Sequence, residues 1–469
     1  MDNEQTQAEQ QSFRDRIATV DAKGKRKWIF AQKPKGKFYS IRSYVSWFFF
    51  VLFVALPFIH IGGRPLFLFN IVKAKFIIFG KVFWPQDFFI FGIIMITFIV
   101  FIILFTAAFG RLFCGWVCPQ TIFMEMLFRK LEYLIEGDAA HQKLLAAGPW
   151  TTEKITRKAT KHIVFYLLAF MIANLFLAYI IGVKELWVMI QQPSANIGTI
   201  ASLMVFSFVF YAVYAFFREQ VCTVICPYGR LQGVLLDKNS MVVAYDYKRG
   251  EERKKINKKE ERTAGDCIDC FQCVKVCPTG IDIRNGTQME CVGCTACIDA
   301  CDHMMESVGF EKGLVRYASE NGIANHEKLR YTRRMKMYTA LLIVLTGLLT
   351  TLLVTRKDIT ATVMRTPGLL FQEKGTDSVS NLYNIKVVNK TVEDIPLTVK
   401  LEDANGTVQL VGNNIHVQKE GQGAGSFFIT LPKSRITQRK TVLHVGLYQG
   451  NKKIDAVKTS FLGPLYSNN

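Results

Sequence analysis

The long apolar segments of this sequence contain no charged side chain and no histidine in their middle. An ion pump or transporter normally needs an ionisable residue inside the membrane as a pathway or relay. A membrane haem needs histidine ligands there. Both classes are therefore disfavoured. Each segment is about long enough to cross a bilayer of roughly 30 Å. The five segments cover about 44–62, 88–109, 163–181, 198–217 and 338–354.

Acidic residues are scarce relative to basic ones: 38 Asp and Glu stand against 58 Lys and Arg, a net charge of +20. The segments between the apolar stretches are alternately rich and poor in basic residues. This alternation indicates that the charges orient the protein in a membrane, and it argues against a nucleic-acid partner. The Lys and Arg counts are 10 in 1–42, 4 in 61–87, 8 in 110–162, 1 in 182–197 and 20 in 218–337. The positive-inside rule predicts a multi-pass membrane protein whose N-terminus, residues 110–162 and cysteine-rich segment face the cytoplasm. With five spans the C-terminal region lies outside, in the periplasm if the cell is Gram-negative.

Cysteine is absent after Cys301, which excludes disulfide bonds from the C-terminal region. From residue 361 onward the sequence alternates with period two, in short runs separated by turn signals. About seven strands in roughly 100 residues indicate an immunoglobulin-like sandwich. No catalytic group is evident in it, so we expect a docking module. The runs are LYNIKVVNK, DIPLTVKLED, TVQLVG, NIHVQ, SFFITLP, TVLHVGLYQG and KIDAVKTSF.

Two segments near the start, residues 1–42 and 64–87, are not predicted to span the membrane. Residues 1–42 form a basic tail that is too long for a signal peptide and lacks a small-residue cleavage site, so we expect a retained cytoplasmic anchor. Residues 64–87 are apolar but are interrupted by Lys73, Lys75 and Lys81. We expect an interfacial hairpin or amphipathic segment on the outer face. A sixth span is the alternative.

Eight of the 12 cysteines lie in one stretch, in two tandem runs with the spacing C-x2-C-x2-C-x3-C. Three thiolates two residues apart fit a tight loop around three corners of an iron–sulfur cube, and the fourth ligates the other cluster. This predicts two [4Fe–4S] clusters. The ligands of cluster 1 are Cys267, Cys270, Cys273 and Cys301, and those of cluster 2 are Cys291, Cys294, Cys297 and Cys277.

Two other interpretations of these runs are weaker. Structural zinc sites usually have two separated C-x2-C pairs, whereas each run here has three cysteines spaced two residues apart and a fourth cysteine after them. Disulfide bonds would be unusual in a segment that the charge pattern places in the reducing cytoplasm.

The other four cysteines form an internal repeat. GRLFCGWVCPQ follows the second apolar segment and REQVCTVICPYGR follows the fourth, so each two-span hairpin ends in C-x3-C-P. A helical turn places both sulfurs of such a pair on one face, and the proline then breaks or kinks the helix. Packing of the two hairpins could bring four sulfurs together at the membrane surface. These candidate redox or copper thiols belong to Cys114, Cys118, Cys222 and Cys226.

The spacing does not decide what the four thiols bind. Soft thiolates select copper(I), zinc or iron–sulfur groups, and buried thiols also pack as small hydrophobes. A redox or copper role, a structural zinc site and inert packing therefore all stay open.

These patterns predict a multidomain membrane protein. A five-helix α transmembrane region carries an inserted bacterial-type two-cluster ferredoxin domain (α+β), and an all-β immunoglobulin-like sandwich follows. The expected parts are a tail at 1–42, a four-span membrane domain at 43–235, a cytoplasmic ferredoxin domain at 236–337, a fifth helix at 338–354 and a periplasmic sandwich at 355–469.

Several motifs together resemble one family, the membrane-bound ferredoxin-type accessory proteins of cytochrome c oxidase known as the CcoG or FixG family. The similarity runs from about Arg64 to the C-terminus. It includes FGKVFWPQDF at Phe79–Phe88, both C-x3-C-P elements, YDYKRGEER at Tyr245–Arg253, CPTGIDIRNG in the cluster block and GLVRYAS at Gly313–Ser319.

The resemblance implies a role in assembling a cbb-type cytochrome c oxidase, by reducing copper(II) to copper(I) before delivery. Expected partners are oxidase assembly factors or copper-delivery proteins, the lipid bilayer and an electron donor that the sequence does not identify. Two other functions stay open. One is an electron-transfer subunit that relays electrons from a quinone or a cytoplasmic donor to a periplasmic reductase. The other is a scaffold in which the clusters are only structural.

Overall fold

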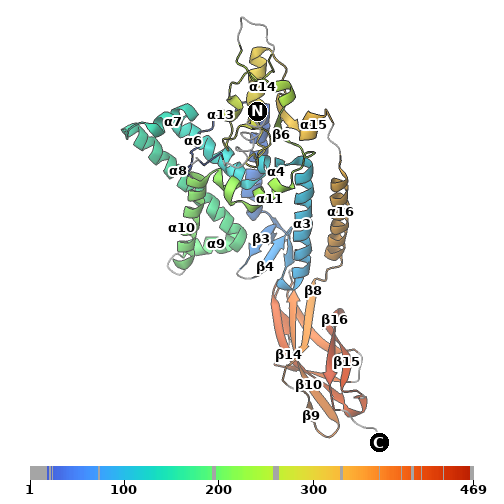
Figure 1. The fold of residues 1–469 in the computed structure, drawn as a ribbon. Coiled ribbons are helices and arrows are strands. Elements are labelled where there is room, and N and C mark those ends of the chain that lie inside the picture. Colours follow the sequence, from blue (N-terminus) through green and yellow to red (C-terminus); the bar gives the residue numbers. More distant parts are fainter. Residues whose placement is uncertain are drawn as a thin grey trace. The chain divides into compact units, whose positions relative to one another are not determined.

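The computed structural model describes residues 18–20, 23, 25–71, 74–192, 197–256, 264–327, 331–368, 370–391, 393–402, 406–412, 415–436 and 438–464 (Figure 1). The chain forms two compact units. One comprises Met1–Gly80 and Pro85–Leu349, and the other comprises Lys81–Trp84 and Thr350–Asn469. The predicted membrane and ferredoxin domains thus fold as a single unit, because the cluster segment packs on the C-x3-C-P segments. The sandwich belongs to the other unit.

The described residues contain five helices that are long and apolar enough to cross a membrane. They confirm the predicted membrane region but extend three of its segments toward the N-terminus. The fifth begins at Arg333 and not at residue 338. The first helix begins at Lys37, well before residue 44, and the third begins at Thr152, because the Thr151 hydroxyl accepts a hydrogen bond from the Lys154 amide and caps it. The five are Lys37–Phe58 (α2 and η1), Phe88–Phe109 (α3), Thr152–Ile181 (α8), Ile197–Phe217 (α10 and η5) and Arg333–Val354 (α16).

Shorter helices connect these spans and carry the thiols. The α8 span packs against η3, which follows the first C-x3-C-P element, and against η5 (Val213–Phe217), which precedes the second. In this core Phe128 stacks on Tyr214 at 4.4 Å and meets Phe165 edge-on at 4.9 Å. The connecting helices are α4 (Leu112–Trp116), α5 (Pro119–Thr121), η3 (Ile122–Phe128), α6 (Arg129–Glu136), α7 (Ala139–Ala147), α9 (Val183–Gln191), η6 (Val221–Ile225) and α11 (Pro227–Leu235).

The segment after the first span forms short strands. Strands β3 and β4 pair antiparallel, with Phe67 opposite Ile78 and Asn70 opposite Lys75. The described part of residues 64–87 is thus a β-hairpin, and it contains no sixth spanning helix; Lys73 lies outside the described residues. The strands are β1 (His60–Ile61), β2 (Arg64–Pro65), β3 (Phe67–Asn70), β4 (Lys75–Ile78) and β5 (Lys81–Phe83).

The cluster segment is a small α+β fold between two antiparallel strands, in which Val242 pairs with Ala318 and Tyr245 with Val315. Its buried core combines aliphatic side chains such as Ile283, Ile298 and Leu314 with the cysteines themselves. The elements are β6 (Val242–Tyr245), α12 (Tyr247–Gly250), α13 (Gln272–Lys275), η7 (Ile283–Asn285), α14 (Ala296–Val308), β7 (Val315–Ala318) and α15 (Glu320–Ala324).

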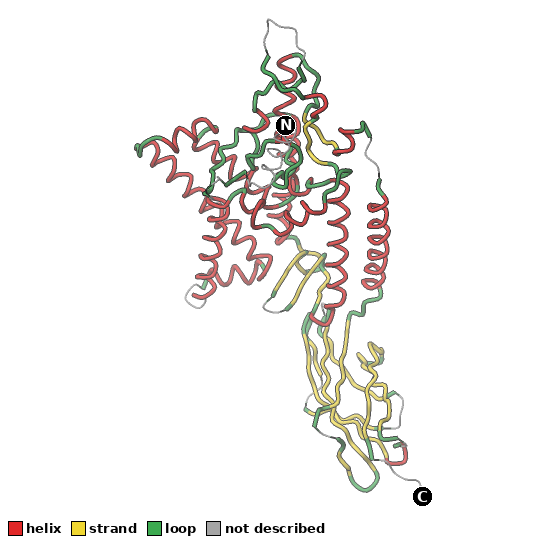
Figure 2. The backbone as a smooth tube through the Cα atoms, in the orientation of Figure 1, coloured by secondary structure: helices red, strands yellow, loops and turns green. Residues whose placement is uncertain are grey.

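The C-terminal unit is a two-sheet sandwich, drawn in yellow strands in Figure 2. One sheet has the order β12-β14-β10-β8, with β9 beside β10, and the other has the order β13-β11-β15-β16. All seven predicted runs form strands, and β8 and β9 were not predicted. The core between the sheets includes Tyr383, Phe427 and Phe461. The strands are β8 (Ile359–Arg365), β9 (Gln372–Lys374), β10 (Ser378–Asn389), β11 (Ile395–Leu401), β12 (Thr407–Val411), β13 (Ile415–Val417), β14 (Gln422–Pro432), β15 (Lys440–Gln449) and β16 (Lys452–Leu462).

Candidate iron–sulfur and thiol site

The two cysteine runs share one backbone conformation. In the first run the residues on either side of the middle cysteine, Asp269 and Phe271, have φ of 52° and 59°. In the second run Gly293 and Thr295 occupy the same places, with φ of 69° and 64°. Left-handed residues between right-handed ones turn successive N–H groups toward one side, and such concave loops hold iron–sulfur groups in many proteins. The sequence repeat is therefore also a repeat of structure.

The loops surround two neighbouring cavities. One, of about 340 Å³, is lined by Cys267, Cys270, Cys273 and Cys301, together with apolar side chains such as Met305 and Leu314. This set of thiols is the one predicted for cluster 1.

The other cavity, of about 350 Å³, is lined by Cys277, Cys291, Cys294 and Cys297, and also by Cys273. It therefore combines Cys277 from the first run with three cysteines of the second. Because Cys273 borders both cavities, the two sites adjoin.

Hydrogen-bond donors at the second cavity suit an anionic group. The backbone N–H groups of Thr279, Gly280 and Ile281 all point to the Cys277 sulfur, and the Thr279 hydroxyl lies 3.4 Å from it. Burial raises the pKa of Cys291 to about 12, so the bare thiol is protonated at neutral pH. Iron would have to displace this proton on binding. The cavities, donors and thiols fit two [4Fe–4S] clusters, which supply one-electron transfer when bound.

The two C-x3-C-P elements also share one geometry. The Cys118 amide donates to the carbonyl oxygen of Phe113 at 3.0 Å, and the Cys226 amide donates to that of Val221 at 2.7 Å. Each bond spans five residues, so each turn is wider than the expected α-helical turn. Each second cysteine is extended, with ψ of 125° or 112°, and the proline after it begins a new helix.

These two turns place the four thiols near enough for their charges to affect one another, although among the described residues no three His, Cys, Asp or Glu side chains form a group that could hold one metal ion. Burial raises the pKa of Cys222 to about 12, and charge on each of the other three thiols adds to this effect. Burial likewise raises the pKa of Cys114 to about 11, with added contributions from Cys118 and Cys226. We call Cys114, Cys118, Cys222 and Cys226 the four-thiol group.

The four-thiol group packs directly on the second cluster loop. Cys114 and Cys294 belong to one buried cluster, and the half-buried Cys222 packs against it. A Cβ atom on Gly115 would stand only 2.5 Å from the Gly293 carbonyl oxygen, so the two backbones touch here without side chains between them. Arg42 joins both segments, because its Nε donates to the Gly115 carbonyl at 2.7 Å and its Nη1 to that of Cys294 at 3.5 Å.

The basic tail has a role that sequence reasoning missed. The Gln32 amide donates to the carbonyl oxygen of Lys275 at 2.8 Å. The buried Asp299 carboxylate, on α14, accepts from the amides of Phe38 at 3.1 Å and Tyr39 at 2.7 Å. A carboxylate at a helix N-terminus is stabilised by the unpaired N–H groups and the helix dipole. Asp299 therefore fixes the start of the first membrane helix to the cluster segment.

A buried ion-pair network joins the two repeats and was also missed. Arg218 donates to both Glu132 oxygens, at 3.1 and 2.8 Å, and Lys161 Nζ lies 3.5 Å from the same carboxylate. Arg129 lies 3.8 Å from Glu219. All five side chains are buried. In the sequence these charges flank apolar segments and indicate only membrane topology, because their partners lie far along the chain.

We expect Glu132→Ala to lower the free energy of unfolding by about 3–5 kcal/mol, because it leaves Arg218 and Lys161 buried without their shared carboxylate. Thermal unfolding in detergent measures this. The control is Glu153→Ala, which removes an exposed pair with Arg157 at 2.9 Å and should cost at most about 1 kcal/mol. Equal losses in both variants would contradict the role of the network.

The same carboxylate predicts a pH dependence. Burial acts to raise the pKa of Glu132, but Arg218, Lys161 and Arg129 outweigh it and lower the pKa below its ordinary value. The resulting stabilisation is complete above the unfolded-state pKa of about 4.3 and is lost as the pH falls through the folded-state pKa. The Glu132→Ala variant should lack this part of the acid sensitivity.

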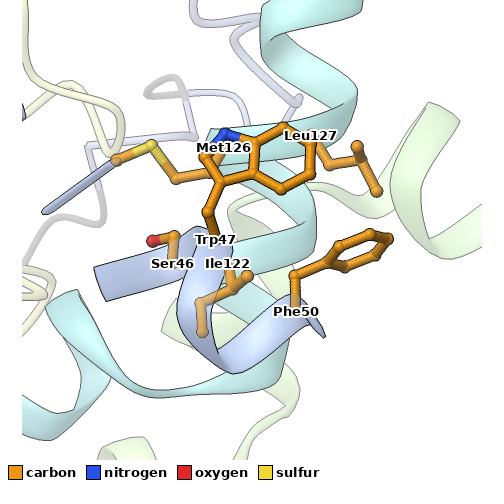
Figure 3. Close-up of a pocket in the computed structure, with 6 residues that line it drawn as sticks. All are labelled: Ser46, Trp47, Phe50, Ile122, Met126 and Leu127. Atoms are coloured by element: carbon orange, nitrogen blue, oxygen red, sulfur yellow. The ribbon is translucent and has the colours of Figure 1, made fainter. Parts of the chain in front are cut away.

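One further pocket lies between α2 and η3 (Figure 3). It has a volume of about 220 Å³, and its lining is apolar apart from one serine. The described residues that line it include no thiol and no ionisable group, so it offers no redox chemistry of its own. They are Ser46, Trp47, Phe50, Ile122, Met126 and Leu127.

Comparison with known proteins agrees with this site. Residues 217–320 match the family described as 4Fe-4S dicluster domain, and residues 91–136 match one described as 4Fe-4S binding domain. Residues 349–464 match the family described as IG-like fold at the C-terminal of FixG. The nitrogen fixation protein FixG of Rhizobium meliloti is 30% identical over 88% of this chain and 88% of its own length. This chain belongs to the FixG family.

Other FixG-type proteins are also similar. Protein RdxA of Cereibacter sphaeroides is 31% identical over 78% of this chain and 80% of its own length. A solved FixG-related protein from Vibrio parahaemolyticus covers 24% of this chain, at 21% identity and a TM-score of 0.21. The predicted family and fold class are confirmed, and the chain is an iron–sulfur electron-transfer protein of the FixG and RdxA type in a membrane.

Proposed function

We propose that this FixG-family protein reduces copper(II) to copper(I) for the assembly of a cbb-type cytochrome c oxidase. The observation that carries the proposal is the packing of the four-thiol group on the second cluster loop. The contact runs through Gly115 and Gly293 and through the buried cluster of Cys114 and Cys294, against which Cys222 packs. Electrons on the clusters could therefore be transferred directly to the adjacent group of four soft sulfur donors.

The electron chemistry is simple. A [4Fe–4S] cluster gives up one electron at a time, and copper(II) needs one electron to become copper(I). Iron–sulfur potentials extend down to roughly −700 mV, so this reduction is thermodynamically undemanding. The four thiols serve as the redox group between the cluster segment and copper. Copper(I) prefers thiolate and thioether ligands, which also suits transfer to a thiol-bearing delivery protein.

The charge pattern supports an arrangement across the bacterial inner membrane. Segments 1–42, 110–162 and 218–337 carry 10, 8 and 20 Lys and Arg residues, against 4 and 1 in the segments between them. The proposal therefore puts the N-terminus and the cluster segment in the cytoplasm and the sandwich in the periplasm. A cytoplasmic or membrane-bound donor would supply the electrons. Oxidase assembly factors or copper-delivery proteins would be the partners.

The test uses the full chain, purified anaerobically in detergent. We expect that chemically reduced protein, freed of excess reductant, reoxidises when copper(II) is added, and that each cluster oxidised yields one copper(I), trapped by a copper(I)-specific chelator. Protein oxidised beforehand is the control and should yield none. Clusters that stay reduced in the presence of copper(II) would overturn the proposal.

A further inference from the structure

Two buried arginines from the membrane part of the chain adjoin the second cluster site. Arg42, on α2, donates from Nε to the Gly115 carbonyl oxygen at 2.7 Å and from Nη1 to that of Cys294 at 3.5 Å. Arg111, two residues after α3, donates from Nη1 to the Met289 carbonyl oxygen, just before the second cysteine run. Both guanidinium groups are buried, so water and salt screen their charges only weakly.

Each arginine also has a buried N–H group with no hydrogen-bond partner in the described part of the chain. These are Nη2 of Arg42 and Nε of Arg111. A donor buried without a partner costs free energy, so such groups in a native protein indicate a further partner. Neither arginine forms an ion pair with a carboxylate of the described residues. The two donors and two charges therefore suit an anionic group in the second cavity.

The charges of these arginines act on the ligands of cluster 2. Burial raises the pKa of Cys294 to about 11, and Arg42 is the largest influence that opposes this rise. Burial also raises the pKa of Cys291, and the Gly293 amide and Arg111 oppose it. Each arginine thus favours negative charge on a different sulfur of the second set.

Two carboxylates on neighbouring elements are held by other partners. Glu125 adds to the rise in the pKa of Cys294 that burial causes, but its carboxylate pairs with Arg129 at 2.9 Å. Asp299 accepts hydrogen bonds from the amides at the start of α2. The protein therefore leaves the positive charges of Arg42 and Arg111 for the group bound in the cavity.

The first cluster site has the opposite balance of charge. Arg284 lines its cavity, but its guanidinium pairs with Asp282 at 2.6 Å and with Asp269 at 2.5 Å. Burial and the neighbouring thiols raise the pKa of Cys301, and the charge of Asp302 adds to this rise. All eight ligand cysteines are buried or half-buried. The two sites thus differ more in charge than in exposure.

We propose that Arg42 and Arg111 set the reduction potential of cluster 2 above that of cluster 1 and so direct electrons toward the four-thiol group. Reduction adds one negative charge, and a positive charge nearby stabilises the reduced state more than the oxidised state. One electron then passes from cluster 1, which is oxidised, to cluster 2, which is reduced, with no proton and no change of bonds. The arginines are positioning residues, because they ligate no iron. The inference goes beyond the proposed function, since it concerns the order of the clusters and needs no copper.

The test is a potentiometric titration of the anaerobically purified full chain, followed by electron paramagnetic resonance. We expect cluster 2 to be reduced at the higher potential. Cys270→Ser, which removes a ligand of cluster 1, and Cys294→Ser, which removes one of cluster 2, assign the two signals. Arg42→Gln and Arg111→Gln should each lower the potential of cluster 2 more than that of cluster 1. We expect a shift of at least about tenfold in the one-electron equilibrium, or about 59 mV.

Two control variants separate charge from packing. Arg42→Lys keeps the positive charge and should keep most of the potential of cluster 2. Arg157→Gln removes a charge from an exposed ion pair on α8 and should change neither potential. Because Arg111→Gln removes the second charge independently, the test does not depend on the folding of a single variant.

Two results would overturn the inference: reduction of cluster 1 first in the parent protein, or glutamine variants in which the potential of cluster 2 is unchanged or falls no more than that of cluster 1. The titration contains no copper, so its outcome is separate from the proposed function. The expected order of potentials without copper reduction would remove only the proposed function. Copper reduction with the reverse order would remove only this inference.

Discussion

Serine in place of Cys277 is expected to remove cluster 2, although Cys277 belongs to the first cysteine run. The physical reason is that its sulfur lines the second cavity with Cys291, Cys294 and Cys297, and receives backbone N–H groups there. A serine hydroxyl cannot replace the thiolate as a ligand of comparable softness. The variant should lose about four irons per chain, and its electron paramagnetic resonance spectrum should match that of Cys294→Ser.

The matched control is Cys301→Ser, the corresponding change in the second run. Its sulfur lines the first cavity with Cys267, Cys270 and Cys273, so its spectrum should match that of Cys270→Ser. Comparison of four variants in two pairs separates loss of one cluster from general unfolding, because unfolding would remove both signals. If the Cys277→Ser spectrum matched Cys270→Ser, each run would ligate its own cluster and the crossed assignment would be wrong.

Alanine in place of Gly115 is expected to separate the second cluster loop from the four-thiol group. The added methyl would stand 2.5 Å from the Gly293 carbonyl oxygen and 2.8 Å from that of Val292, and both neighbours are backbone. Overpacking of this kind costs about 1–3 kcal/mol. We expect a lower unfolding temperature and slower copper(II) reduction per cluster, with the iron content of clusters 1 and 2 retained.

The control for this change is Gly92→Ala, in the membrane helix α3. A Cβ atom there meets nothing within 4 Å, and alanine is the better helix former, so stability and copper reduction should be unchanged. Stopped-flow optical measurement of cluster reoxidation gives the rate for both variants. Equal rates in Gly115→Ala and the parent protein would show that electrons leave by another route.

Local patterns were enough for much of this fold. The five apolar segments became five spanning helices, and all seven alternating runs became strands of the sandwich. These elements follow from periodicity over short stretches, where each residue's partner is either lipid or the next strand. The sequence predicted the first residues of these helices less accurately. The first helix begins at Lys37 because Asp299, far along the chain, accepts hydrogen bonds at its N-terminus.

The sequence by itself determined the iron–sulfur chemistry of the eight tandem cysteines, since their spacing limits which metal groups a loop can surround. The tertiary structure alone decided how those groups are arranged. It placed Cys114 in one buried cluster with Cys294, against which Cys222 packs, and it paired Glu132 with Arg218 across 86 residues. The contact of the thiols with Cys294 depends on the close approach of backbones at Gly115 and Gly293. No local sequence pattern predicts these contacts, because each one joins residues that lie far apart in the chain.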